Sequence, residues 1–266
     1  MLSHKIYAHA SSDQWVVFVH GAGGSSVIWY KQLKSFKEEF NLLLIDLRGH
    51  GASQTKNGIT QIKKLQQYTF EHISNDILEV LDHLNIQKAH FIGISLGTIL
   101  IREITEQHPE RVSSAIMGGA VLKINLKGKF LIKLGNIFQS IIPYIWLYKL
   151  FAFVIMPKNN HKKSRNLFIR EARKLYQKEF KRWFKLTAQL GPRLKFFRQQ
   201  PSLVPTLYVM GEKDHMFLPS VKEVVMNDQL ASLVVVANSG HVVNVDAAHD
   251  FNSTVITFIK GLANKN

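Results

Sequence analysis

The sequence contains no cysteine among its 266 residues. Disulfide bonds and thiolate metal sites are therefore excluded, and the composition fits a reducing compartment. The stretch Met1–Tyr7 also lacks the apolar run of a secretory signal peptide, so we expect a cytoplasmic protein. The 12 histidines are scattered without a ligand-like cluster, and we expect neither a metal ion nor a cofactor.

Acidic residues are nearly absent from residues 121–200. This stretch holds 19 Lys and Arg side chains but only two carboxylates, Glu171 and Glu179, which gives it a net charge of +17. The rest of the chain has a net charge of −2, so the overall charge of +15 comes entirely from this stretch. Such a concentration of one sign favours either a solvated face or an anionic partner.

A long uninterrupted apolar run is also missing. The most apolar segment is Phe130–Met156, but Lys133, Pro143 and Lys149 interrupt it. A membrane-spanning helix requires about 20 continuous apolar residues. We therefore expect two helices broken near Pro143, with apolar side chains that line an acyl-accepting pocket and pack on the rest of the protein. Insertion of this segment into a membrane is the alternative interpretation.

Outside residues 121–200, short apolar runs alternate with segments of helical spacing. The runs are typical of strands buried on both faces, and they lie at Trp15–Val19, Asn41–Ile45, Ala89–Ile94, Val112–Met117, Pro205–Gly211 and Leu233–Ala237. Helical spacing occurs at Val27–Phe40, Thr69–Leu84, Ile99–Ile104, Ser220–Val225 and Phe251–Leu262. The alternation predicts an α/β fold in which helices flank both faces of a mostly parallel sheet.

One serine stands at a predicted strand-to-helix turn, in the motif Gly93-Ile94-Ser95-Leu96-Gly97. A sharp turn strains the serine backbone and tolerates only small neighbours, which explains the two glycines. The serine hydroxyl is then held clear of the backbone, and the amide of Leu96 lies at a helix start where it can receive an oxyanion. Ordinary strand-to-helix connections also contain this motif, so the motif needs support from other residues.

Asp214 and His241 each follow a later predicted strand. The carboxyl ends of parallel strands share one edge of the sheet, so both side chains are expected near Ser95. A serine hydroxyl needs a base to become nucleophilic, and a histidine can accept its proton and return it to a leaving group. A carboxylate must orient that histidine; Asp214 is our candidate, with Glu212 and Asp246 as alternatives.

Five motifs in this order resemble those of the α/β-hydrolase superfamily, over nearly all of the chain outside residues 121–200. They are His20-Gly21-Ala22-Gly23-Gly24, Asp46-Leu47-Arg48-Gly49-His50-Gly51, the serine motif, Gly211-Glu212-Lys213-Asp214 and Ser239-Gly240-His241. The resemblance implies a core of residues 1–120 and 201–266, with residues 121–200 forming a basic helical cap or lid. It also implies the catalytic residues Ser95, Asp214 and His241, in the family's order.

The same resemblance assigns roles to the loops around the serine. It implies an oxyanion hole formed by the backbone amides of Ala22 and Leu96. It also implies that His20 braces the glycine-rich turn and that Asp46, Arg48 and His50 belong to a hydrogen-bonded loop scaffold. His50 as a general base is the alternative interpretation, which His241 makes unnecessary.

These expectations describe a carboxylesterase-like serine hydrolase that cleaves a small-molecule acyl ester through an acyl-enzyme. Two alternatives are a lipase or acylglycerol hydrolase docked on a membrane and a small-molecule receptor that retains the hydrolase pocket. Thioester, amide and C–C hydrolysis and acyl transfer use the same residues and stay open. The sequence does not define the chain-length preference or the oligomeric state.

The segment Lys158–Leu190 combines aromatic and basic residues. One predicted helical face carries Phe168, Ala172, Tyr176, Phe180, Trp183, Phe184 and Thr187, and Lys and Arg crowd the remainder. A solvated face, peripheral contact with an anionic membrane and binding of nucleic acid are the three interpretations. Basic amphipathic helices with aromatic residues lie on membrane surfaces. Because no nucleic-acid-binding motif accompanies the charge, we expect no nucleic acid partner.

Overall fold

A computed structural model describes residues 1–54, 68–138, 142–158 and 161–263 of the chain. Its centre is a seven-stranded sheet in the order β1-β3-β2-β4-β5-β6-β7, in which only β1 is antiparallel to its neighbour. The strands are β1 His4–Tyr7, β2 Trp15–Val19, β3 Asn41–Ile45, β4 Ala89–Ile94, β5 Val112–Gly118, β6 Thr206–Gly211 and β7 Ala231–Val236. The predicted α/β class and mostly parallel sheet are confirmed.

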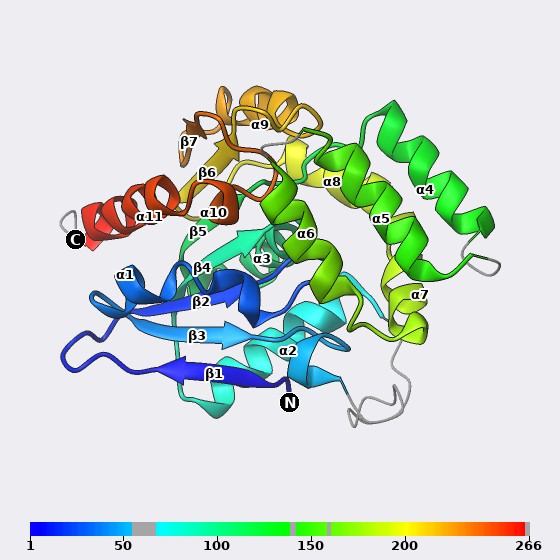
Figure 1. The fold of residues 1–266 in the computed structure, drawn as a ribbon. Coiled ribbons are helices and arrows are strands. Elements are labelled where there is room, and N and C mark those ends of the chain that lie inside the picture. The colour runs from blue at the N-terminus through cyan, green and yellow to red at the C-terminus, as the bar shows by residue number, and fades with distance from the viewer. Residues whose placement is uncertain (55–67, 139–141, 159–160, 264–266) are drawn as a thin grey trace.

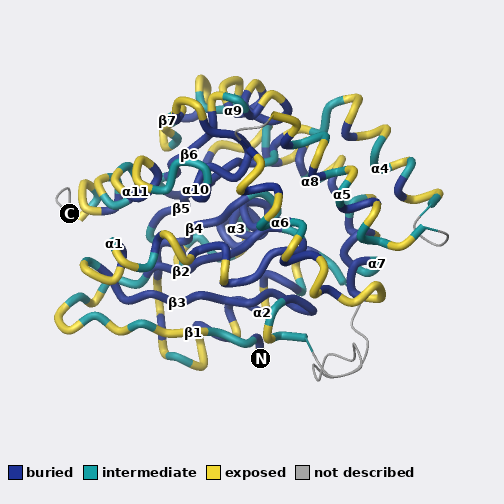
Figure 2. The backbone as a smooth tube through the Cα atoms, viewed as in Figure 1, coloured by how far each residue is buried: buried dark blue, intermediate teal, exposed yellow. Residues whose placement is uncertain are grey.

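The apolar runs form the central strands because both faces of the sheet are covered (Figure 1, Figure 2). Alternate residues of β2 enter two different cores: Val17 and Val19 face one, and Val16 and Phe18 face the other. One core is covered by α2 Phe70–His83, α3 Leu96–Gln107 and α9 Leu218–Val225. The other lies under α1 Leu33–Lys37, α10 Val243–Asp246 and α11 Ala248–Ala263.

Five helices lie between β5 and β6 among the described residues. They are α4 Leu126–Phe138, α5 Tyr144–Ile155, α6 Lys162–Ala172, α7 Gln177–Lys185 and α8 Thr187–Gln199. In Figure 1 they lie beside the ends of the parallel strands, to the right of the sheet. We call them the inserted helices. The predicted break near Pro143 is confirmed, since Pro143 directly precedes α5, although residues 139–141 and 159–160 lie outside the described residues.

Two helix predictions are wrong in extent. The segment Val27–Phe40 is not one helix but a 3-10 turn, Ser26–Trp29, followed by α1. Its Gln32 lies at the break, where the side-chain amide donates to the carbonyl oxygen of Asn244 at 2.8 Å, so a tertiary contact overrides the helical spacing.

The segment Lys158–Leu190 is likewise divided, into α6, α7 and the start of α8. Tyr176 is extended and exposed at the start of α7, so it does not continue the buried aromatic row. The hydroxyl of Tyr144 donates to the carbonyl oxygens of Ala172 and Leu175, which stabilises the turn between α6 and α7. The short strand β1 was not predicted, because its two central residues are exposed and it has no apolar run.

Among the described helices, none is both long enough and apolar enough to cross a membrane.

Candidate active site

Ser95 lies between β4 and α3 with a backbone φ of +53° and ψ of −118°. A positive φ is rare for a residue with a side chain and indicates strain that the surrounding structure maintains. A Cβ on Gly97 would collide with the carbonyl oxygen of Val19, and one on Gly93 would lie 2.7 Å from a methyl carbon of Ile101. The turn therefore fits only with glycine on both sides of the serine.

His241 connects Ser95 to Asp214. Its Nε2 lies 2.9 Å from the Ser95 hydroxyl, and its Nδ1 lies 2.8 Å from the Oδ2 of Asp214. In this arrangement Nδ1–H donates to the carboxylate and Nε2 can accept the serine proton. His241 and Asp214 are almost fully buried, so water does not compete for the carboxylate. The structure thus brings together the three side chains that the sequence placed after three different strands.

The two alternative carboxylates do not bond to His241. Glu212 accepts a hydrogen bond from the ammonium group of Lys213, which lowers the pKa of its carboxyl, and another from the backbone N–H of Asn238. Asp246 accepts from the backbone N–H of Gly240 at 2.9 Å. Among the three candidates, Asp214 alone has the geometry to orient the imidazole.

Ala22 and Leu96, the expected oxyanion donors, line one cavity together with Ser95. Leu96 is the first residue of α3, so its N–H has no partner within the helix. The helix start also carries partial positive charge, which favours an oxyanion there.

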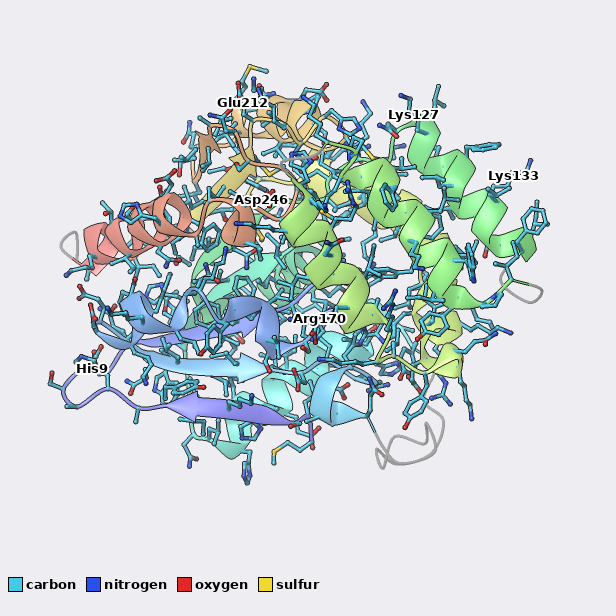
Figure 3. All side chains as sticks on the ribbon, in the orientation of Figure 1. His9, Lys127, Lys133, Arg170, Glu212 and Asp246 are labelled. Carbon is cyan, nitrogen blue, oxygen red and sulfur yellow. The ribbon has the colours of Figure 1, made fainter. Side chains whose placement is uncertain are left out.

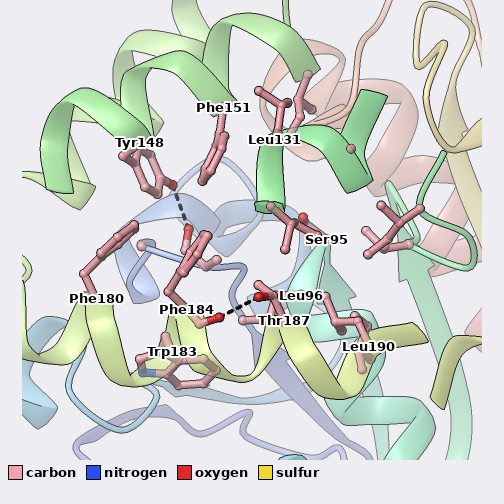
Figure 4. A pocket seen from close by; sticks show the side chains of 18 of the residues that line it. Ser95, Leu96, Leu131, Tyr148, Phe151, Phe180, Trp183, Phe184, Thr187 and Leu190 are labelled. Carbon is pink, nitrogen blue, oxygen red and sulfur yellow. Dashed lines mark hydrogen bonds between the residues drawn. The ribbon is translucent and has the colours of Figure 1, made fainter. Parts of the chain in front are cut away.

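The cavity next to Ser95 has a volume of about 230 Å³, and it is almost entirely apolar. Figure 4 shows side chains of the inserted helices around it, opposite Ser95 and Leu96. The inserted helices contribute Gly128, Leu131, Ile132, Tyr148, Phe151, Ile155, Phe180, Trp183, Phe184, Thr187 and Leu190, and the turn between α6 and α7 contributes Leu175. The volume is below the range of about 300–1,000 Å³ that is typical of sites for drug-sized ligands. The cavity therefore suits a compact apolar group.

Comparison with known proteins agrees with this architecture. The sequence profile of the alpha/beta hydrolase fold matches residues 14–140. This profile covers just under half of the chain, and it agrees with the α/β-hydrolase fold of the structure. The 3-oxoadipate enol-lactonase 2 of Acinetobacter baylyi is 30% identical over 109 residues, which are 41% of this chain and 38% of that protein. The match thus spans well under half the length of this curated relative.

Two solved structures share the fold over nearly the whole chain. The enol-lactonase from Burkholderia xenovorans LB400 superposes with a TM-score of 0.77 at 19% identity, covering 97% of this chain and 96% of that one. A thermophilic esterase from Thermogutta terrifontis superposes with a TM-score of 0.79 at 15% identity, covering 98% and 93%. At these identities the likeness concerns the fold.

Two buried histidines support the loops near Ser95. His20 accepts at Nε2 from the N–H of Leu47, 3.0 Å away, and donates from Nδ1 to the carbonyl oxygen of Gly21. His50 accepts at Nε2 from the N–H of Gly23, 3.0 Å away. Burial lowers the pKa of both imidazoles, that of His50 to about 3. His50 is therefore neutral with its acceptor nitrogen occupied, which argues against the interpretation of this residue as a general base.

The only two acids of residues 121–200 are both buried against the core. Glu171 on α6 accepts from the hydroxyl of Ser25 at 2.8 Å. Glu179 on α7 accepts from the hydroxyl of Tyr68 and pairs with Arg182 at 2.5 Å. The sequence showed that these two acids are the only ones in residues 121–200. It did not show that they connect the inserted helices to the rest of the protein, because their partners are far away in the chain.

Tyr148 on α5 is a site residue that the sequence analysis missed. Its hydroxyl donates to the carbonyl oxygen of Ala22 at 2.7 Å, within the turn that is expected to supply an oxyanion donor (Figure 4). The only signal in the sequence is a tyrosine hydroxyl within an apolar segment, a feature that Tyr144 shares, and nothing there indicates the partner of Tyr148. No group of three or more His, Asp or Glu side chains that could hold a metal occurs in the part of the chain that the structure describes.

Proposed function

We propose that this protein is a serine hydrolase that cleaves a carboxylic ester or lactone through an acyl-enzyme on Ser95. The observation that carries the proposal is the hydrogen-bonded series Ser95, His241 and Asp214 beside an apolar cavity. Relatives named as an enol-lactonase and an esterase support the ester or lactone class. The inserted helices act as a cap over the acyl group.

In the first half-reaction the Ser95 oxygen attacks the carbonyl carbon of the ester while His241 Nε2 takes the serine proton. Asp214 stabilises the resulting imidazolium and keeps its orientation. The amides of Ala22 and Leu96 donate to the oxyanion of the tetrahedral intermediate, at no cost of reorganisation. The C–O bond to the alcohol then breaks, and the alcohol leaves with the proton from His241.

In the second half-reaction water attacks the acyl-enzyme. His241 takes one proton from this water, and the new oxyanion is held by the same two amides. Collapse breaks the bond to Ser95, the serine regains its proton from His241, and the carboxylic acid leaves. Each cycle consumes one ester and one water and yields one acid and one alcohol; a lactone yields one hydroxy acid.

Labelling with a fluorophosphonate probe, followed by turnover of short p-nitrophenyl esters, tests the proposal. Labelling of the natural protein and its loss in Ser95→Ala and His241→Ala are expected, with kcat lowered by about 10⁴-fold or more in both variants. Ser253→Ala, at an exposed serine, serves as the matched control and retains labelling. A folded protein that binds ester but turns over once at most would contradict the proposal and favour a receptor.

A further inference from the structure

Helix α4 has apolar side chains on two opposite faces. Gly128, Leu131 and Ile132 face inward and line the cavity. On the other side Leu126, Phe130 and Ile137 are 83%, 64% and 58% exposed. Their spacing of four and seven residues puts them in one row along the helix. A helix of a soluble domain normally turns polar residues outward, so the outer row needs a separate explanation.

Helix α5 repeats this arrangement. Tyr148, Phe151 and Ile155 face the cavity, and Trp146, Leu150 and Phe153 are 64%, 39% and 51% exposed at a spacing of four and three residues. The helices lie next to each other in Figure 1, and a Cβ on Gly135 of α4 would lie 3.1 Å from the ring of Phe151 on α5. Together the two rows contain six of the sixteen exposed large apolar side chains among the described residues. The exposed apolar residues are therefore concentrated on these two helices.

The outer rows are accompanied by positive charge alone. Lys127, Lys129 and Lys133 are exposed along α4, and Figure 3 shows Lys127 and Lys133 extending outward from it. On α5 the ammonium group of Lys149 lies 5.3 Å from the ring centroid of Trp146. Neither helix contains an acidic residue. The carboxylates of Glu171 and Glu179 are buried, so they do not offset this charge at the surface.

We propose that the outer face of α4 and α5 docks on an anionic lipid bilayer. We call this face the docking face and define it by Leu126, Lys127, Lys129, Phe130, Lys133, Ile137, Trp146, Lys149, Leu150 and Phe153. Its lysines contact lipid phosphates, and its apolar rows enter the boundary between headgroups and acyl chains. Docking does not require ester hydrolysis, although it places the opposite, cavity-lining faces of the same helices close to the bilayer.

The docking face does not lie on Lys158–Leu190, the segment for which membrane contact was one of three interpretations of the sequence. Phe168, Phe180, Trp183 and Phe184, between Lys158 and Leu190, are all buried, so their apolar face is not available to lipid. The exposed apolar side chains lie instead on α4 and α5, which the sequence analysis expected to line a pocket. Because α4 and α5 each have two apolar faces, one face can line the cavity while the opposite face contacts lipid.

Flotation with vesicles tests the docking face. We expect the protein to float with vesicles of equimolar phosphatidylcholine and phosphatidylglycerol, and much less with phosphatidylcholine alone. A lysine near an anionic leaflet raises partitioning about fivefold, so the triple variant Lys127→Gln, Lys129→Gln, Lys133→Gln should partition about a hundredfold more weakly. The control triple variant Lys34→Gln, Lys88→Gln, Lys222→Gln removes the same charge elsewhere and should change partitioning only slightly, since salt screens distant charges.

The apolar rows are tested separately. Phe130→Ser with Trp146→Ser should weaken partitioning on the order of tenfold, whereas Tyr30→Ser with Met226→Ser, at two other exposed apolar positions, should not. Tryptophan emission should shift to the blue when anionic vesicles are added, and Trp146→Phe should remove most of the shift. All these positions are exposed, and fluorophosphonate labelling of Ser95 or circular dichroism checks the fold.

An equal loss of vesicle partitioning in the two triple lysine variants would overturn the proposal, because it would show that binding depends only on the net charge of the protein. So would flotation with phosphatidylcholine alone that equals flotation with anionic vesicles. Binding of single-stranded RNA through the docking-face lysines, in a protein that does not float with anionic vesicles, would replace the membrane with a nucleic acid partner.

Discussion

The hydroxyl of Tyr148 donates a hydrogen bond to the carbonyl oxygen of Ala22 at 2.7 Å. This bond joins α5, on the inserted helices, to the turn whose amide is a proposed oxyanion donor. Burial raises the pKa of the Tyr148 hydroxyl well above its ordinary value, so the group remains a donor at neutral pH. We therefore expect the position of the inserted helices to affect the shape of the proposed oxyanion hole through this hydrogen bond.

Replacing Tyr148 by Phe should lower kcat for short esters with little change in KM. The ring still fills its site, but the turn at Ala22 loses an anchor that matters most when the oxyanion forms. A net hydrogen bond contributes about 0.5–1.5 kcal/mol, which corresponds to a decrease of about 2–10-fold. Tyr144→Phe is the control, because the Tyr144 hydroxyl on the same helix bonds to Ala172 and Leu175 instead. A KM effect alone, or an equal decrease in the control, would contradict the coupling.

Replacing Asp214 by Asn should lower kcat by about 10⁴-fold while the fold is kept. The amide cannot stabilise the imidazolium of His241, and it favours the wrong tautomer. Glu212→Gln and Asp246→Asn are the matched comparisons at the two other carboxylates and should cost less than about tenfold, since neither bonds to His241. If Asp246→Asn were the more damaging change, the assignment of the orienting acid would have to be reversed.

The sequence predicts the sheet well because its central strands are short apolar runs buried on both faces. Val16 to Val19 and Leu42 to Ile45 are all buried, so their composition and their position agree. The order of the motifs also predicts the proximity of Ser95, Asp214 and His241, because the ends of parallel strands meet at one edge.

The inserted helices could not be predicted to the same extent. Their boundaries depend on contacts between residues far apart in the chain, such as Tyr144 with Leu175 and Glu179 with Tyr68. No local pattern encodes such pairs, and helical spacing alone joined α6, α7 and α8 into one segment. The exposed apolar rows of α4 and α5 were not predicted either, because the sequence does not indicate which face of an apolar helix other elements will cover.

Stability should decrease as the solution is acidified below about pH 6.5. Burial lowers the pKa of His50 to about 3 and that of His90 to about 4, and that of His20 also falls. Below pH 6.5 the unfolded chain therefore binds protons at these histidines that the folded chain does not bind. The free energy of unfolding is unaffected by these histidines above the pKa of the unfolded chain, about 6.5. It decreases as the pH falls from there toward the lower pKa values of the folded protein. Each such histidine contributes a slope of about 1 kcal/mol per pH unit.

Urea unfolding at pH values from about 6.5 down to about 5 measures this slope, before most carboxylates titrate. His90→Asn retains an acceptor or donor for the hydroxyl of Ser114, which lies 2.8 Å from Nδ1, but removes one titrating group. The slope should therefore decrease by about 1 kcal/mol per pH unit. His249→Gln, at an exposed position, is the control and should leave the slope as it is. An unchanged slope in His90→Asn would show that this imidazole is protonated in the folded protein.

Replacing Gly49 by Ala should weaken the packing of α7 against the rest of the protein. The φ of Gly49 is +73°, and a Cβ there would run into the carboxylate of Glu179. That carboxylate cannot swing aside freely, because it is buried and held by Tyr68 and Arg182. Gly49→Ala should therefore lower the free energy of unfolding by about 1–3 kcal/mol and expose α7 to limited proteolysis.

Gly261 provides the opposite case, because a Cβ there meets nothing within 4 Å and the residue lies in α11. Gly261→Ala should stabilise the protein by about 0.5–1 kcal/mol, because alanine loses less backbone entropy than glycine in a helix. The two alanine variants should thus change stability in opposite directions, and proteolysis should increase only in Gly49→Ala. If both variants were stabilising, the contact between Gly49 and Glu179 would not hold α7 against the core.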